Sequence, residues 1–223
     1  INMKKIISII FAVFLISSPA NAIDGFGSFT VGVSGNYSGF YGIGTEREYD
    51  ETGASLENTT EESGAFVTTY PSLFLEYNVG DAASIGLEWV PADIDSPTNV
   101  NTSDSASSTE TTRVSVSFEN YATIYGLVRI PFAGLYAKAG FSTVDIAVNE
   151  VTRSGNTYPD TDTTGYTLAL GFEMDSGPLT LRAELAAHEF DDVSVTNNAT
   201  NKNQVDVADM IGATARISIA KSF

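Results

Sequence analysis

Ten charged or titratable side chains lie in segments of this chain where apolar residues alternate with small or polar ones. They are Glu76, Glu88, Arg113, Arg129, Lys138, Glu173, Arg182, Glu184, His188 and Arg216. Because alternate side chains of a β-strand point to opposite faces, those on the polar parity should meet on one face of a sheet. Inside a narrow barrel, charges of both signs should pair, since an unpaired buried ion is costly. The sequence therefore predicts a lumen ionic network, and a narrow or gated channel is the alternative.

His188 is the only histidine and the natural candidate for acid–base catalysis. Its nearest acid on the same face is Glu184, which lies roughly 13 Å away if a strand rises about 3.3 Å per residue. That separation is too long for an orienting hydrogen bond. The sequence has no Gly-x-Ser-x-Gly motif, no paired-histidine metal motif and no nucleophile beside His188. We therefore expect neither enzymatic activity nor a cofactor.

Carboxylates also gather in residues 38–63, where the alternation of apolar and polar residues is lost. Glu46, Glu48, Asp50 and Glu51 offer the hard oxygen ligands that divalent cations prefer. These acids do not have the spacing of an EF-hand. The two interpretations are a cation-binding loop and a solvated acidic face.

Composition restricts the partners and the compartment. The chain has 223 residues, a formal net charge of −17 and no cysteine. Without a basic patch, nucleic acid and anionic lipid surfaces are poor partners. Without cysteine, an exported fold must be held by packing and strand pairing alone.

The first residues have the order of a secretory signal peptide. Lys4 and Lys5 precede an apolar run over residues 6–16, and a small-x-small cleavage site ends at Ala22. We expect a signal peptide over residues 1–22 and a single barrel domain over residues 23–223. An uncleaved membrane anchor is the alternative, although the apolar run is too short to span a bilayer.

The remaining sequence predicts β-strands joined alternately by long and short connections. The expected strands are residues 26–37, 64–79, 83–92, 112–130, 135–148, 166–174, 179–190 and 209–223. The expected long loops are residues 38–63, 93–110, 150–163 and 191–206, whereas the other connections are tight turns. Transmembrane barrels keep their periplasmic turns short and their outer loops long. We predict an all-β fold, an eight-stranded antiparallel up-and-down transmembrane β-barrel.

Two local features should interrupt this pattern. The apolar parity changes near Glu119 and Asn120, which predicts a β-bulge and leaves the direction of Arg113 and Arg129 open. Pro71 lies inside a predicted strand and has no backbone N–H, so it requires a bulge or an unpaired site.

The terminal strand alternates Ile217 and Ile219 with small or polar residues and ends on Phe223. A terminal ring suits the aromatic girdle of a membrane barrel, and a soluble strand with one buried face is the alternative. With the signal peptide and the eight alternating segments, this ending resembles the small bacterial outer-membrane β-barrel proteins. That group includes outer-membrane protein X, the barrel of outer-membrane protein A and the opacity-protein-like porin family.

The resemblance implies a location in the bacterial outer membrane, among its lipid and lipopolysaccharide. It also implies that Ile217, Ile219 and Phe223 form the signal read by the barrel-assembly machinery. The expected role is surface contact or envelope structure, with acidic loops turned toward an extracellular ligand. A narrow porin for ions or small solutes is the second interpretation, and a soluble periplasmic lipocalin-like binder is the third.

Overall fold

The computed structural model describes residues 28–50, 52–105, 108–131, 133–151, 157–200 and 202–223, so the predicted signal peptide lies outside the described residues. Within these ranges the secondary structure is β-strand. The strands are β1 (Phe29–Tyr49), β2 (Leu56–Val79), β3 (Ala83–Trp89), β4 (Ile94–Asp95), β5 (Asn99–Ser105), β6 (Ser108–Arg129), β7 (Leu135–Val151), β8 (Thr161–Ser176), β9 (Leu179–Phe190), β10 (Val193–Thr196) and β11 (Gln204–Ser222). Among the described residues, no helix has the length and apolarity needed to cross a membrane.

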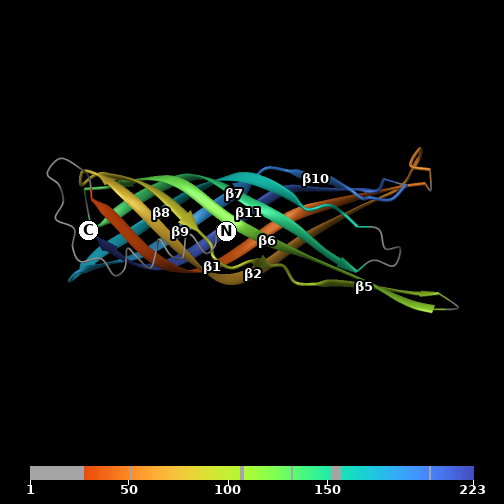
Figure 1. The fold of residues 1–223 in the computed structure, drawn as a ribbon, viewed down its shortest axis with the longest axis horizontal. Coiled ribbons are helices and arrows are strands. Elements are labelled where there is room, and N and C mark those ends of the chain that lie inside the picture. The colour runs from red at the N-terminus through yellow and green to blue at the C-terminus, as the bar shows by residue number, and fades with distance from the viewer. Residues whose placement is uncertain (1–27, 51, 106–107, 132, 152–156, 201) are drawn as a thin grey trace, which may run out of the picture.

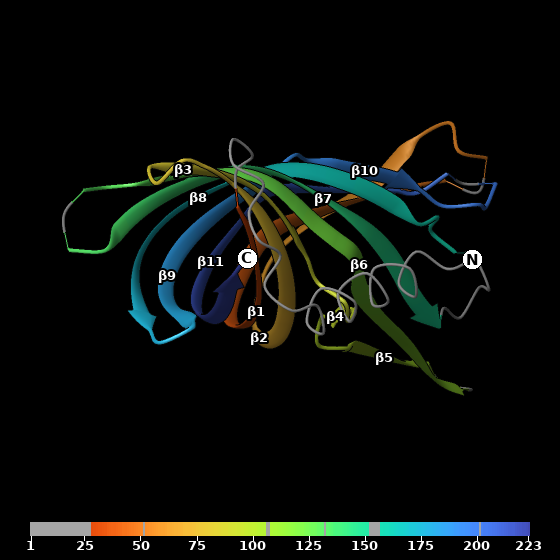
Figure 2. The ribbon, with the colours of Figure 1, turned by 60° about the vertical axis from the view of Figure 1, so that its left-hand side comes forward.

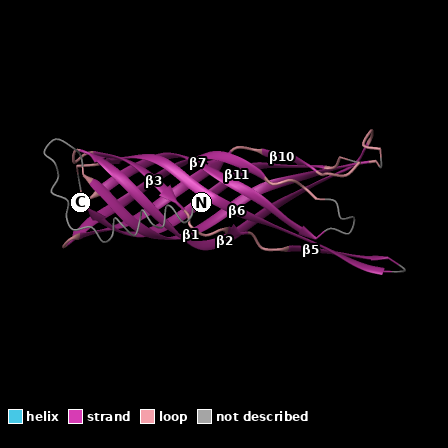
Figure 3. Ribbon diagram, viewed as in Figure 1, coloured by secondary structure: helices cyan, strands magenta, loops and turns pink. Residues whose placement is uncertain are grey.

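Eight of these strands close into a ring. The order around the barrel is β1, β2, β3, β6, β7, β8, β9 and β11, and β11 pairs back with β1 in the antiparallel sense. Phe29 and Phe223 exchange backbone hydrogen bonds, so the first and last strands meet at the end of the short turns. Figures 1 and 3 show the tilted strands of the closed wall. The predicted eight-stranded up-and-down barrel is confirmed.

The apolar parity of each strand faces outward. On β8, Leu168 and Leu170 are each 66% exposed, whereas Ala169 between them and Thr167 before them are buried. Ile217 on β11 is similarly exposed, at 68%. A lipocalin-like binder would need the apolar parity inside, so this arrangement contradicts the soluble alternative. An apolar exterior around a polar interior is the arrangement of a transmembrane barrel.

The hairpins at the outer end are longer and more regular than the sequence predicted. Residues 38–63 and 93–110 were expected to be loops, and that prediction is wrong for most of them. β1 and β2 remain paired as far as Tyr49 and Leu56, and β5 forms a hairpin with β6. These extensions carry polar residues on both faces, which removes the alternation although the backbone ladder continues. Figures 1 and 2 show both hairpins at the same end, diverging from one another.

The bulge and the proline site both lie where the sequence predicted an interruption. The register of β6 and β7 shifts between Glu119 and Ala122, and Asn120 has a φ of 52°. Pro71 is paired with Gly35 of β1, but β3 pairs with β2 only from Leu73 onward. Pro71 therefore lies where the wall begins to separate between β2 and the chain that follows β3.

Candidate functional site

The most buried acid of the lumen forms a bidentate ion pair. Glu76 of β2 is 0% exposed, and its two carboxylate oxygens accept hydrogen bonds from Nη1 and Nη2 of Arg182 at 2.6 and 2.9 Å. The hydroxyl of Tyr125 donates a third bond to Oε1 of Glu76, at 2.9 Å. Two parallel N–H···O bonds fix both position and orientation, so this pair holds β2 against β9 across the lumen.

Arg182 connects this pair to a second acid. Its Nε lies 3.1 Å from Oε2 of Glu173, and Nε of Arg129 lies 2.6 Å from Oε1 of the same carboxylate. Arg129 also donates to Oγ of Ser84 at 2.8 Å. The structure therefore places Arg129 in the lumen, settling the direction that the sequence left open.

A second group of four charges lies beside the first. Arg216 of β11 contacts both Glu88, at 2.6 Å, and Glu184, at 2.9 Å. Lys138 contacts the same two acids from β7, at 3.4 and 2.7 Å. Nε of Arg216 donates to Oδ1 of Asn36 at 2.6 Å, which ties the group to β1. Two cations and two carboxylates balance in this group, as Arg129 and Arg182 balance Glu76 and Glu173 in the other.

Two tyrosine rings complete the packing around the charges. Tyr125 and Tyr136 are both buried, and Tyr136 donates to Oε2 of Glu184 at 3.0 Å. Each ring lies against a glycine of the next strand. A Cβ at Gly86 would come within 2.3 Å of the Tyr125 ring, and one at Gly171 within 2.2 Å of the Tyr136 ring. Only glycine permits this close approach.

The ionic network leaves almost no free volume. The space among Glu76, Glu88, Arg182, Glu184 and their neighbours measures about 10 Å³. A buried water needs about 10–15 Å³, so this space is at the lower limit for one molecule. The charged and aromatic side chains therefore pack closely around this space.

His188 lies buried in the lumen, where hydroxyl groups hold it and where it makes no ion pair with another described residue. Nδ1 is 2.9 Å from Oγ1 of Thr167, and Nε2 is 2.8 Å from Oγ1 of Thr214. The hydroxyl of Tyr121 lies 3.4 Å from Nδ1. The ring is thus held between the hydroxyl groups of Thr167, Thr214 and Tyr121. The side chain of Arg113 lies outside what the structure describes, although its backbone belongs to β6.

The predicted cation ligands have separate partners. Glu46 accepts a hydrogen bond from Tyr158 at 3.3 Å, and Glu48 accepts one from Asn58 at 3.2 Å. Asp50 accepts from the backbone N–H groups of the turn that follows it, and Glu51 lies outside the described residues. Among the residues whose placement is described, no three His, Asp or Glu side chains could hold a metal ion together.

Two of these acids have shifted pKa values. Burial raises the pKa of Glu46 above its ordinary 4.5, and the neighbouring charge of Glu48 adds to the shift. The backbone N–H of Ala54 lowers the pKa of Asp50, with help from the Thr52 hydroxyl. Asp50 therefore stays ionised as the acceptor of its turn, whereas Glu46 takes up a proton more readily.

The terminal strand presents its expected signal residues on the outside of the barrel. Ile217 and Ile219 are exposed on the apolar face, and Phe223 pairs with Phe29 at the end of the wall. The ammonium group of Lys221 lies 4.8 Å from the centre of the Phe223 ring. The aromatic end of the strand is therefore held at the rim.

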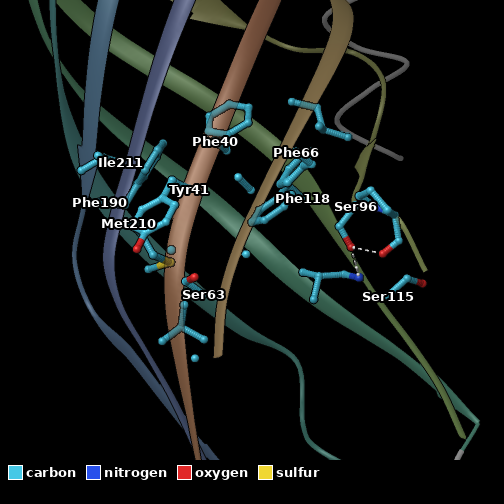
Figure 4. Close-up of a pocket in the computed structure, with 18 of the residues that line it drawn as sticks. Phe40, Tyr41, Ser63, Phe66, Ser96, Ser115, Phe118, Phe190, Met210 and Ile211 are labelled. Carbon is cyan, nitrogen blue, oxygen red and sulfur yellow. Dashed lines mark hydrogen bonds between the residues drawn. The ribbon is translucent and has the colours of Figure 1, made fainter. Parts of the chain in front are cut away.

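An apolar pocket that the sequence analysis missed lies at the outer end of the lumen. Its volume is about 520 Å³, and Figure 4 shows Phe40, Phe66, Phe118 and Phe190 around it. The ring centres of Phe40 and Phe66 are 5.5 Å apart, and those of Phe66 and Phe118 are 6.0 Å apart. The available signal was that the inward parity of β1 changes from small or polar residues to phenylalanine at Phe40.

Comparison with solved structures identifies similar folds. Outer membrane protein OprG from Pseudomonas aeruginosa matches with a TM-score of 0.58 and 14% identity, over 89% of this chain and 98% of that protein. Outer membrane protein AlkL matches with a TM-score of 0.49 and 15% identity, over 93% and 95% of the two chains. The outer membrane protease OmpT from Escherichia coli gives 0.48 and 11%, over 93% and 99%.

No protein-family model and no curated protein matches the chain. At 14% identity, the likeness to OprG concerns the fold alone. It agrees with the predicted β-barrel architecture.

Proposed function

We propose that this chain is a non-enzymatic protein of the bacterial outer membrane that serves the envelope surface and does not conduct ions. The observation that carries the proposal is the charge-balanced ionic network, which leaves about 10 Å³ of free space among its side chains. An ion crossing this level would have to break pairs such as Glu76–Arg182, whose contacts are as short as 2.6 Å. Such buried pairs are costly to break.

The route to the membrane is part of the proposal. Cleavage after Ala22 would release the chain for export, and Ile217, Ile219 and Phe223 would guide its insertion by the barrel-assembly machinery. The exposed apolar parity supports contact with membrane lipid and lipopolysaccharide, because lipid-facing strands require it.

In this proposal the outer hairpins are exposed on the cell surface. Residues 56–65 of β2 are exposed throughout and carry Glu57, Glu61 and Glu62. A paired acidic hairpin that projects from the wall suits contact with a neutral or cationic surface ligand. Protease added to intact cells should cut at residues 50–55 and leave the barrel strands uncut.

Conductance in planar bilayers separates this proposal from the narrow porin. The wild-type barrel should insert and show no discrete current steps, while a porin reconstituted in the same way should conduct. Heat-modifiable migration of the same sample in detergent gels establishes that the barrel is folded. Discrete steps from the wild type that change in Arg182→Ala or Glu184→Ala would make the chain a pore.

A further inference from the structure

The proposed surface role does not use the apolar pocket at the outer end of the lumen. Below it, the interior is filled by ion pairs, hydroxyl groups and the buried rings of Tyr125 and Tyr136. At the level of Phe40, Phe66 and Phe118, apolar rings line the interior and leave about 520 Å³ open. Pockets of about 300–1,000 Å³ with mainly apolar walls are typical of small-molecule sites. The change in both polarity and volume marks this level as a ligand site.

The pocket has a firm floor and a defined wall. Tyr121 lines it from below and packs with Val90, Ile94 and Val144 in a buried cluster. Phe190 meets Tyr121 edge to face, with ring centres 6.1 Å apart. Rings held by such packing give a ligand a preformed surface, which lowers the entropy cost of binding.

The pocket is accessible along the line where the barrel wall separates. Outward of Leu73, β2 has no ladder with β3, whereas β4 and β5 pair with β6 instead. One side of the pocket is residues 62–66 of β2, and Ile94 and Ser96 lie on the other. Figure 4 shows Phe66 and Ser96 on the two sides of this gap in the strand pairing.

The charges at the rim restrict the ligand to one chemical class. Glu62 lines the pocket itself, and Glu46 and Glu61 lie on the paired strands beside it. The nearby cation Arg47 is paired with Asp206. An apolar molecule with a carboxylate, sulfonate or phosphate group would be repelled by the negative charge of these acids.

We propose that this aromatic pocket binds a neutral apolar small molecule and that the acidic rim excludes apolar anions of the same size. This binding activity goes beyond the proposed surface role and does not depend on it.

A matched pair of fluorescent probes tests the proposal on the whole barrel in lipid nanodiscs. N-phenyl-1-naphthylamine is neutral, and 1-anilinonaphthalene-8-sulfonate carries the same ring system with one negative charge. After subtraction of protein-free nanodiscs, the neutral probe should bind saturably with one site per barrel. The anionic probe should bind at least about tenfold more weakly, and added salt should narrow the difference because it screens the rim.

A glycine at the pocket provides the blocking variant. Gly64 lines the pocket, shares the inward parity of Phe66, and has no atom within 4 Å of an added Cβ. Gly64→Leu should place a side chain in the pocket. It should weaken binding of the neutral probe at least about tenfold, because the side chain takes up volume that the probe needs. Gly126 has the same open surroundings but is exposed on the outside of the barrel, so Gly126→Leu should leave binding unchanged.

Glu62→Gln tests the rim separately, because it should strengthen the anionic probe more than the neutral probe and so narrow the difference between them. Heat-modifiable migration of each variant establishes that the barrel is folded. The proposal is overturned if the neutral probe shows no saturable binding, or if Gly64→Leu and Gly126→Leu have the same effect. Equal binding of both probes, unaffected by Glu62→Gln, would refute selection by charge.

Discussion

Removing one partner of the Glu76–Arg182 pair should cost far more stability than removing both. With Glu76→Met, Arg182 keeps only Glu173, which it contacts at 3.1 Å and which Arg129 also requires. With Arg182→Met, Glu76 keeps only the Tyr125 hydroxyl, at 2.9 Å and 0% exposure. Each single variant leaves an unbalanced buried charge and should lower the free energy of unfolding by about 3–5 kcal/mol.

The double variant restores the charge balance, because Glu173 and Arg129 still pair with each other. Its remaining cost is the Tyr125 hydroxyl, which loses its acceptor and should cost about 1–3 kcal/mol. If the single costs simply added, the double variant would lose about 6–10 kcal/mol. The reasoning therefore requires a coupling energy of about 3 kcal/mol or more.

Urea unfolding in lipid vesicles measures this cycle. Trp89 is the only tryptophan of the chain and is buried at the end of β3, so its fluorescence reports on the barrel. The matched control is Leu170→Met with Leu185→Met, an uncharged cross-strand pair on the exposed face, which should be additive. Additive losses for Glu76→Met and Arg182→Met would refute the account of the network as one charge-balanced unit.

Three further predictions concern single positions. Gly171→Ala should lower the free energy of unfolding by about 1–3 kcal/mol, because the Tyr136 ring must move, whereas Gly126→Ala should stay within about 0.5 kcal/mol in the same urea titration. Asn120→Val should lower it by about 1–2 kcal/mol, because a β-branched residue resists positive φ, and Asn120→Gly should be better tolerated. Glu46 has a raised pKa in the folded state, so its stabilising contribution is present at low pH and is lost as the pH rises through that pKa. Carboxyl NMR should give a midpoint above 4.5, and Glu46→Gln should remove that part of the pH dependence.

The wall of the barrel could be predicted because its strands have contrasting faces. Residues 179–190 were predicted as a strand and form β9 with the same bounds, since leucines on one parity alternate with polar or small residues on the other. The outer half of β2 could not be predicted in this way. Between Leu56 and Gly64 both faces are polar, and only pairing with β1 reveals a strand.

The interior could be predicted as a set of charges but not as pairs. Parity assigns Glu76 and Arg182 to the lumen, yet they are 106 positions apart and meet only because of strand register and tilt. The pocket was missed for the same reason. Phe40, Phe66 and Phe118 come from three strands, and the sequence does not specify the strand register and tilt that bring them to one level.

A pair of cysteine variants tests most directly whether one parity of the wall contacts lipid while the other is packed into a sealed lumen. The chain has no native cysteine, so Leu170→Cys and Ala169→Cys each provide one thiol on neighbouring residues of opposite parity. In lipid vesicles, a spin label at position 170 should collide often with oxygen dissolved in the bilayer and rarely with a water-soluble nickel chelate. The thiol at position 169 should resist a charged methanethiosulfonate reagent until urea unfolds the barrel. Rapid reaction at position 169 in the folded protein would mean a water-filled lumen and would contradict the account.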